Sequence, residues 1–226
     1  MTINYCFQFL SFLSRKNQFG GQISPLEVQL AITAGQKGYY EFLMGRVQQF
    51  TYGKPIPKVG LGMGTKIELD LSPFKVDAQS ATVTSNIVPY PTNFNFLSLM
   101  TDSSGRKIER LADSKLPGRL NSKIDPITDS SKGFYTIGKT GWNIYPQNLI
   151  STVFLYYYTK PVDVIFNWYP DPNTGLPVYN PIGSVDPQFN DIAMEEVLGR
   201  ACTILGFSFE QQSLVEFGKE VLVQGE

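Results

Sequence analysis

The chain has 226 residues, of which 42% are hydrophobic and 17% charged, the composition of a folded protein of one or two domains with a sizeable core. It contains no histidine, which excludes the usual general base, the Ser-His and Cys-His pairs and most zinc sites. The net charge of −1 indicates no partner by itself.

The first part of the chain predicts two helices. Residues 2–14 carry apolar side chains every three or four positions. Ser24-Pro25-Leu26-Glu27 is a capping box with proline at the first helical position, and it predicts a helix that runs to about Met44 and stops at Gly45. A signal peptide is not expected, because no basic region precedes the apolar start. No apolar run approaches the roughly 20 residues of a membrane span.

The middle of the chain predicts a block of roughly eight strands. In Thr65–Leu71, apolar Ile67, Leu69 and Leu71 alternate with charged residues, the pattern of a half-buried strand. Residues 113–132 are expected to form an exposed loop, and Asp171 to Gly175 a turn. The other expected strands are 81–90, 94–100, 107–111, the hairpin 133–139 and 142–145, 151–160, and an extended run over 161–168.

Aromatic residues are concentrated between Gly133 and Trp168, and they predict the core of a β domain. Within this stretch Tyr156, Tyr157 and Tyr158 follow one another, so at least one of them must face away from the core of a sheet. Exposed tyrosines are common at interfaces, which makes this run a candidate inter-subunit contact. Ordinary core and edge packing is the alternative.

The last part of the chain returns to helical periodicity. Asp186-Pro187 predicts a helix start, with Gly206 as its end. A second capping box over residues 208–211 predicts a final helix to about Leu222. The fold class expected is α+β. Residues 1–50 together with 186–226 form a helical bundle, and 51–185 form an inserted antiparallel β-sandwich or barrel-like domain.

Opposite charges are concentrated at the two ends of the chain. Residues 1–58 carry six Lys/Arg and two Asp/Glu, whereas residues 186–226 carry two and eight. One hypothesis is that 186–226 of one copy docks against 1–58 of the next, with Glu195 and Glu196 as contacts. The alternative is two solvated helical faces. Arg106, Lys107 and Arg110 begin the most basic stretch, which suits a solvated loop, a protein contact or DNA phosphates.

No motif in the sequence indicates a catalytic, cofactor-binding or metal site. Gly60-Leu61-Gly62-Met63-Gly64 precedes an expected strand, whereas a phosphate-binding loop opens a helix. The turn at Asp171 lacks the glutamate that completes a calcium loop. Cys6 and Cys202 are expected to be buried free thiols, since a disulfide would need an oxidising compartment. Glu195 and Glu196 are adjacent and point about 100° apart on a helix, so they form no paired site.

Three segments resemble structural proteins of short-tailed, crAss-like bacteriophages and head–tail connector proteins in general. They are FLSFLSRKNQFGGQISPLEVQLAITAGQKGYYEFLMG, GWNIYPQNLISTVFLYYYTKPVDVIFNW and SVDPQFNDIAMEEVLGRACTILGFSFEQQSLVEFGKEV. The resemblance implies a homo-oligomeric ring of about twelve copies in the virion neck. Such rings extend the portal channel, bind further neck and tail components and let DNA pass without sequence-specific binding. It implies no catalytic residue, cofactor or membrane partner.

We therefore expect a virion structural protein that is assembled in the bacterial host cytoplasm and is not an enzyme. The alternative is a virion-associated glycan-binding or lytic protein. A lytic enzyme would need two carboxylates roughly 5–10 Å apart across a cleft, and Asp163, Asp171 and Asp186 are the candidates. A receptor-binding module is a third possibility, and such modules are more often trimers.

Overall fold

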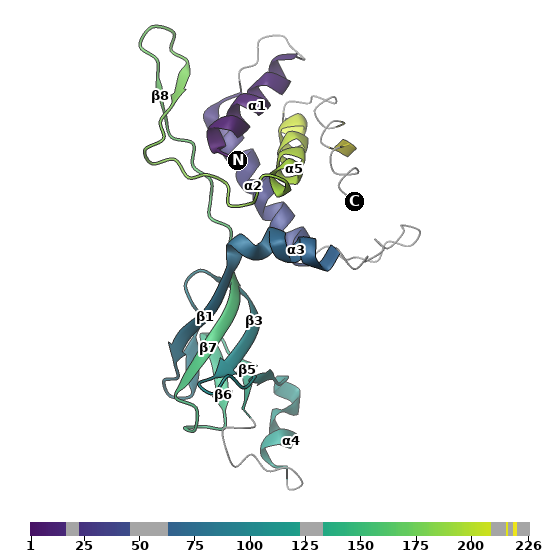
Figure 1. The fold of residues 1–226 in the computed structure, drawn as a ribbon, viewed down its shortest axis with the longest axis vertical. Helices are drawn as coiled ribbons and strands as arrows, with labels where there is room; N and C mark the ends of the chain where they lie inside the picture. The colour runs from purple at the N-terminus through teal and green to yellow at the C-terminus, as the bar shows by residue number, and fades with distance from the viewer. Residues whose placement is uncertain (17–22, 46–62, 123–132, 209–215, 217–218, 221–226) are drawn as a thin grey trace. The chain divides into compact units, whose positions relative to one another are not determined.

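The computed structural model describes residues 1–16, 23–45, 63–122, 133–208, 216 and 219–220. They form a mixed α+β protein that divides into two compact units (Figure 1). The terminal unit comprises residues 1–73 and 161–226, and the inserted unit comprises residues 74–160. The inserted unit is narrower than the expected 51–185, because residues 63–73 and 161–185 belong to the terminal unit.

The two expected N-terminal helices are present as α1 (Ile3–Lys16) and α2 (Pro25–Leu43). Oγ of Ser24 accepts a hydrogen bond from the backbone N–H of Glu27 at 3.2 Å, and the Glu27 carboxylate accepts from the N–H of Ser24 at 2.8 Å. Gly45 has a φ of +76°, which suits glycine at a helix stop. The predicted capping box and the predicted stop are both confirmed.

Helix α5 (Ala193–Ser208) packs against α2 in the terminal unit (Figure 1). At their crossing a Cβ added to Gly35 would lie 2.7 Å from the backbone oxygen of Val197. Real Cβ atoms essentially never come so close, so glycine at this position sets how near the two helices lie. The buried residues of α2 and α5 include Val28, Ala31, Ile32, Met194, Val197, Ala201 and Cys202.

The predicted role of Asp186 as the cap of the C-terminal helix is wrong. Its carboxylate instead accepts a hydrogen bond from the backbone N–H of Ile3 at 2.8 Å, at the start of α1. Helix α5 begins later, where the N–H of Ala193 donates to Oδ1 of Asn190 at 2.8 Å. Gly206 lies inside α5 rather than at its end. The expected final helix over 208–222 lies largely outside the described residues.

The strand predicted over Thr65–Leu71 is wrong: these residues belong to helix α3 (Met63–Leu71), which the short turn η1 (Ser72–Phe74) follows. An alternation of seven residues is too short to separate the two structures. Leu69, expected to face inward, is 61% exposed, whereas Asp70 is only 3% exposed. The buried side is thus set by the tertiary partners of Asp70.

The segment after residue 160 is extended, but it is not a strand of the main sheets. The backbone N–H groups of Val164 and Phe166 donate to side-chain oxygens of Thr33 and Gln29, each at 3.2 Å. These bonds replace sheet pairing, apart from a bridge between Ile165 and Val185. Beyond it, β8 (Trp168–Pro170) and β9 (Pro177–Tyr179) form a hairpin around the predicted turn at Asp171, which is confirmed.

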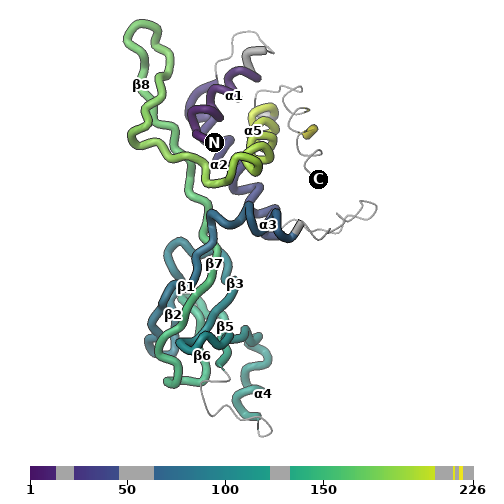
Figure 2. The backbone as a smooth tube through the Cα atoms, in the orientation of Figure 1, coloured from purple at the N-terminus to yellow at the C-terminus, as the bar shows by residue number. Residues whose placement is uncertain are grey.

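The inserted unit contains two sheets, whose backbone Figure 2 traces. The first has the order β1-β7-β3, with β1 (Lys75–Thr82), β7 (Thr152–Thr159) and β3 (Phe94–Asp102). The second has the order β2-β6-β5-β4, with β2 (Ile87–Pro89), β6 (Gly141–Tyr145), β5 (Phe134–Ile137) and β4 (Glu109–Arg110). Neither sheet closes on itself, so the barrel-like expectation is wrong for the described residues. The pairing of β4 with β5 is parallel.

Most strand predictions in this unit are confirmed, with two corrections. The aromatic hairpin and the long strand of residues 151–160 are present as β5, β6 and β7. The strand expected over 81–90 is instead split between β1 and β2 by a turn in which Ser85 and Asn86 have positive φ. The loop expected over 113–132 begins with η2 (Asp113–Lys115) and α4 (Leu116–Leu120), and residues 123–132 lie outside the described part.

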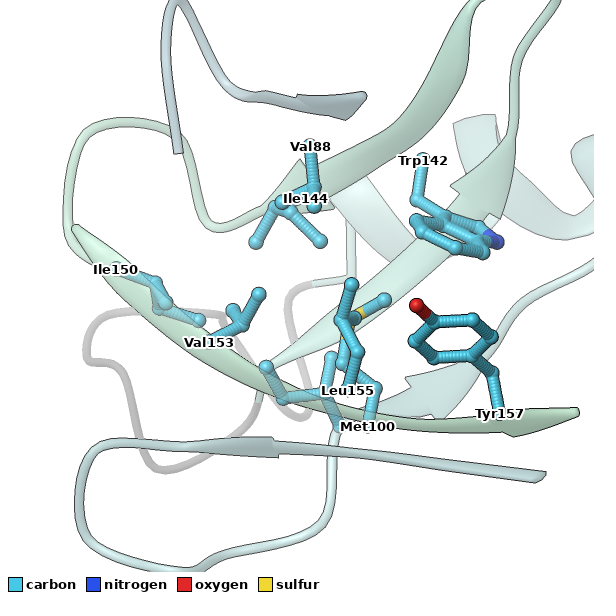
Figure 3. Close-up of a cluster of buried hydrophobic side chains, with 9 residues drawn as sticks. Val88, Met100, Trp142, Ile144, Ile150, Val153, Leu155 and Tyr157 are labelled. Carbon is cyan, nitrogen blue, oxygen red and sulfur yellow. The ribbon is translucent and has the colours of Figure 1, made fainter. Parts of the chain in front are cut away.

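One hydrophobic cluster takes side chains from both sheets (Figure 3). Met100, Val153, Leu155 and Tyr157 come from β3 and β7, and Val88, Trp142 and Ile144 from β2 and β6. The ring of Trp142 meets those of Tyr90 and Phe94 edge-on, with centroids 4.6 and 4.9 Å apart. The aromatic stretch of the sequence therefore supplies the core of the inserted unit, as predicted.

Candidate functional site

The three consecutive tyrosines lie on β7, the central strand of the first sheet. Tyr157 is 2% exposed and belongs to the core, where its hydroxyl donates to Oε1 of Gln79 at 2.5 Å. It is therefore not available as an inter-subunit contact. Tyr156 and Tyr158 are half-buried on the opposite face of the sheet. The predicted alternation of faces is confirmed.

On strands β3 and β7, the outer face of this sheet is apolar and aromatic. Phe96 of β3 lies opposite Tyr158, and Leu99 lies opposite Tyr156, so each pair shares a face. Phe154 continues the row along β7 at a spacing of two residues. Phe96 is 56% exposed, and the other four side chains are half-buried. We call Phe96, Leu99, Phe154, Tyr156 and Tyr158 the aromatic sheet face.

The three basic candidates lie in and after the turn that follows β3. The Asp102 carboxylate accepts hydrogen bonds from the backbone N–H groups of Ser104 and Arg106 and from Nε of Arg106, at 2.8 to 2.9 Å. Burial opposes ionisation of Asp102, but these hydrogen bonds outweigh it and hold the pKa of the carboxyl below its usual value. Nζ of Lys107 lies 3.9 Å from Oε1 of Glu109, and Arg110 is exposed on β4.

The two acidic candidates lie in the first turn of α5, where a negative charge stabilises the helix. Glu195 is exposed, whereas Glu196 is half-buried. Glu195 lines an open hollow on the surface of the terminal unit together with Met1, Thr2, Tyr5, Asp191 and Ile192. The acidic and basic candidates therefore lie on different units.

The terminal unit also holds a buried polar cluster that the sequence did not indicate. The hydroxyl of Tyr39 donates to Oδ2 of Asp70, and Nδ2 of Asn190 donates to Oδ1 of Asp70, both at 2.9 Å. Burial, reinforced by the contact with Asp70, raises the pKa of Tyr39 far above its usual value. The guanidinium of Arg200 lies 5.7 Å from the centre of the Tyr39 ring. These residues come from α2, from α3 and from the region of α5, which are far apart in the sequence, and this is why no local pattern reveals them.

This polar cluster is built for packing rather than for contact with a substrate. Asp70 is almost completely buried and each of its oxygens accepts a hydrogen bond from a neutral donor of the same unit, so little of it is open to a molecule from outside. It joins α2, α3 and the start of α5 within the terminal unit.

The three carboxylates proposed for a lytic enzyme have separate local partners. Asp163 forms an ion pair with Lys37 at 2.5 Å, and Asp186 accepts from the N–H of Ile3. The Asp171 carboxylate accepts from the N–H of Asn173 at 2.9 Å and from the hydroxyl of Thr174 at 3.0 Å. Each therefore has a structural role where it stands.

Cys6 and Cys202 are buried free thiols, as expected. Burial raises the pKa of each thiol to about 12, so neither is an active nucleophile at neutral pH. The described residues contain no group of three or more acidic, cysteine or histidine side chains that could hold a metal ion. Across the same ranges, no helix is both long and apolar enough to cross a membrane.

Three surfaces thus remain as candidates for binding: the aromatic sheet face, the exposed basic residues of the inserted unit and the exposed acidic residues of the terminal unit. No family model matches the chain, and no curated protein sequence matches it either.

Proposed function

We propose that this chain is a structural subunit of a bacteriophage neck or head–tail connector. It assembles into a homo-oligomeric ring of about twelve copies that extends the portal channel, joins the portal to tail components and lets the genome pass. In this proposal the terminal unit is a helical bundle built from both ends of the chain, and the inserted unit is a β-sandwich.

The observation that carries the proposal is the aromatic sheet face. Five large apolar side chains lie together on the outer face of the first sheet, and Phe96 is largely exposed. Monomeric proteins rarely leave such a contiguous patch in water, and aromatic residues are enriched at the centres of interfaces. In a larger assembly this face would be buried against another subunit.

The proposal is tested by the mass of the assembled particle. The full chain, purified from a bacterial host, is analysed by native mass spectrometry and imaged by electron microscopy, alone and with a portal complex. Closed rings are expected. A stable monomer or a trimer under all these conditions would contradict the proposal.

A variant pair tests whether the aromatic sheet face takes part in assembly. Phe96→Ser removes its most exposed aromatic ring and is expected to reduce assembly or binding to the portal complex. The matched control is Ile182→Ser, because Ile182 is even more exposed but lies in a turn of the terminal unit. If the two substitutions reduced assembly equally, the aromatic sheet face would have no specific part in it.

The alternative, a glycan-binding virion protein, draws on the same surface, because aromatic faces stack against sugar rings. Phe96→Ser would then reduce binding to host polysaccharide and leave the oligomeric state unchanged. Polysaccharide binding measured beside particle mass separates the two functions.

A further inference from the structure

The two units of the chain carry net charges of opposite sign. The inserted unit, residues 74–160, carries ten Lys/Arg and six Asp/Glu, whereas the rest of the chain carries nine and fourteen. One unit is thus basic and the other acidic. Between the expected boundaries, residues 51–185, the balance is already thirteen Lys/Arg against ten Asp/Glu, and the observed boundaries move Glu68, Asp70, Asp163 and Asp171 to the acidic unit.

The two ends of the chain are poor partners for each other in a neighbouring copy. Helices α1, α2 and α5 already belong to one compact unit, and α2 packs directly against α5. The charge of Lys37 is taken by Asp163 of the same unit. If the exposed carboxylates of the terminal unit bind another copy, the inserted unit is therefore the better source of the basic partner.

One part of the surface of the terminal unit combines exposed apolar side chains with carboxylates, as interfaces with an apolar centre and a charged rim do. Tyr5 is 51% exposed and stacks on Phe9 with ring centroids 6.3 Å apart, and Ile192 is 71% exposed. Asp191 and Glu195 line the same hollow as Tyr5 and Ile192. We call Tyr5, Asp191, Ile192 and Glu195 the acidic patch. Asp191 accepts from the amino group of Met1, so Glu195 supplies the uncompensated charge.

The basic surface of the inserted unit lies between the end of β3 and α4. Arg106, Lys107, Arg110 and Lys115 are exposed there, and we call these four residues the basic edge. Among the described residues, the ion pairs of this surface join Arg106 to Asp102 and Lys107 to Glu109. They do not involve Arg110 or Lys115, so these two cations are the best placed to meet a carboxylate of another molecule.

We propose that the basic edge of one copy binds the acidic patch of a second copy. The two surfaces differ, so the contact is heterologous: each copy uses its basic edge toward one neighbour and its acidic patch toward the other. A contact of this kind closes into a ring when the rotation between copies fits. This inference rests on the proposed function, for which it names the surfaces that join neighbouring copies.

Charge reversal on each surface tests the contact in the full chain. Glu195→Lys and Arg110→Glu, made separately, are each expected to weaken self-association at least tenfold, because each places like charges opposite one another. Glu68→Lys and Lys139→Glu are the matched controls, since they reverse an exposed charge on the same units outside the two surfaces. Sedimentation velocity over a range of concentrations gives the association constants.

The decisive experiment mixes the Glu195→Lys and Arg110→Glu variants. In the mixture, the intact basic edge of Glu195→Lys meets the intact acidic patch of Arg110→Glu, and the two altered surfaces also have opposite charges. Association is therefore expected to return in the mixture, and to weaken again at high salt. Recovery on mixing also shows that neither variant had simply failed to fold.

The outcomes separate this contact from the proposed function. If the unaltered chain forms rings and neither reversal weakens them, the contact is wrong and the ring stands. If the unaltered chain never associates, the proposed function itself falls. If the reversals change only the thermal stability of the monomer and leave the association constant unchanged, the contact between copies is overturned.

Discussion

The two units of this protein are held together in different ways. The inserted unit is one continuous stretch, residues 74–160, in which strand pairing and a shared aromatic core supply the order. The terminal unit joins segments from both ends of the chain, and side chains hold its irregular parts. Gln36 is buried, donates through Nε2 to the oxygen of Val162 and accepts at Oε1 from the N–H of Gln188, both at 2.9 Å.

This difference indicates where each unit is vulnerable. The inserted unit depends on the volume of a few large side chains, since close-packed cores respond to every lost methylene. The terminal unit depends on close helix contact and on single polar residues that satisfy the backbone of a distant segment. The predictions below test this contrast, from the largest expected effect to the smallest.

The largest effect is expected for Trp142→Ala in the inserted unit. Trp142 is almost fully buried and meets two other aromatic rings, so its loss should lower the free energy of unfolding by about 3–5 kcal/mol. Urea denaturation followed by aromatic circular dichroism measures it. Ile137→Ala on the same hairpin, where the side chain is half-exposed, should cost much less. If Trp142→Ala destabilised the helices of the terminal unit as much as the inserted unit, as followed by far-ultraviolet circular dichroism, the proposed difference between the two units would be wrong.

A close contact in the terminal unit gives the next effect. Gly35→Ala would place a Cβ 2.7 Å from the oxygen of Val197 and force α2 and α5 apart, at a cost of about 1–3 kcal/mol. Gly38→Ala is the matched control on the same helix, since its nearest neighbour would be Cδ of Arg200 at 3.9 Å. This control should be neutral or stabilising by up to about 1 kcal/mol. Far-ultraviolet circular dichroism during thermal unfolding compares the two variants.

A smaller effect is expected at the start of α1. Asp186→Ala removes the acceptor for the N–H of Ile3 and should cost about 0.5–2 kcal/mol, as the loss of a helix cap does. Asp186→Asn keeps an acceptor oxygen and should recover most of the stability. Hydrogen exchange at the first turn of α1 reports the change directly. If Asp186→Ala and Asp186→Asn were equally stable, the hydrogen bond from the N–H of Ile3 would not be what stabilises the start of α1.

The smallest effect is a change in thiol reactivity, which reports on the terminal unit alone because both cysteines lie there. At pH 8 Cys6 and Cys202 should not react with Ellman's reagent until the protein is unfolded. Burial raises their pKa from the ordinary 9.0 to about 12, so they favour the folded state below pH 9. This contribution is lost as the pH rises from 9 through 12. If Cys6 and Cys202 reacted as fast in the Trp142→Ala variant as in the urea-unfolded protein, the two units would unfold together.

Sequence patterns predicted the elements in which one local signal dominates. The capping box at Ser24, the stop at Gly45 and the turn at Asp171 depend on side chains that bond their own neighbourhood, and all three are found. The alternation of Tyr156 to Tyr158 follows from strand geometry alone. For the candidate surfaces, the sequence named the charged residues Glu195, Arg106, Lys107 and Arg110, which are exposed, but it also named Tyr157 as a candidate contact, and that side chain is buried.

Predictions failed where a distant partner decides. Asp186-Pro187 has the local form of a helix start, yet Asp186 bonds Ile3 at the other end of the chain. Residues 65–71 alternate like a strand, yet Asp70 is drawn inward by Tyr39 and Asn190 and the segment is helical. The domain boundary shifted for the same reason, since the backbone of residues 162–166 bonds side chains of α2.

The sequence by itself determined the α+β class, the helices at the N-terminal end, the aromatic core strands and the separate character of the middle of the chain. Periodicity and capping act over a few residues, and so they can be read without the fold. Only the tertiary structure decided where the inserted unit begins and ends, and thus on which unit each charged residue lies. Burial and hydrogen bonding between distant segments settle those boundaries, and such contacts leave no mark in the local pattern.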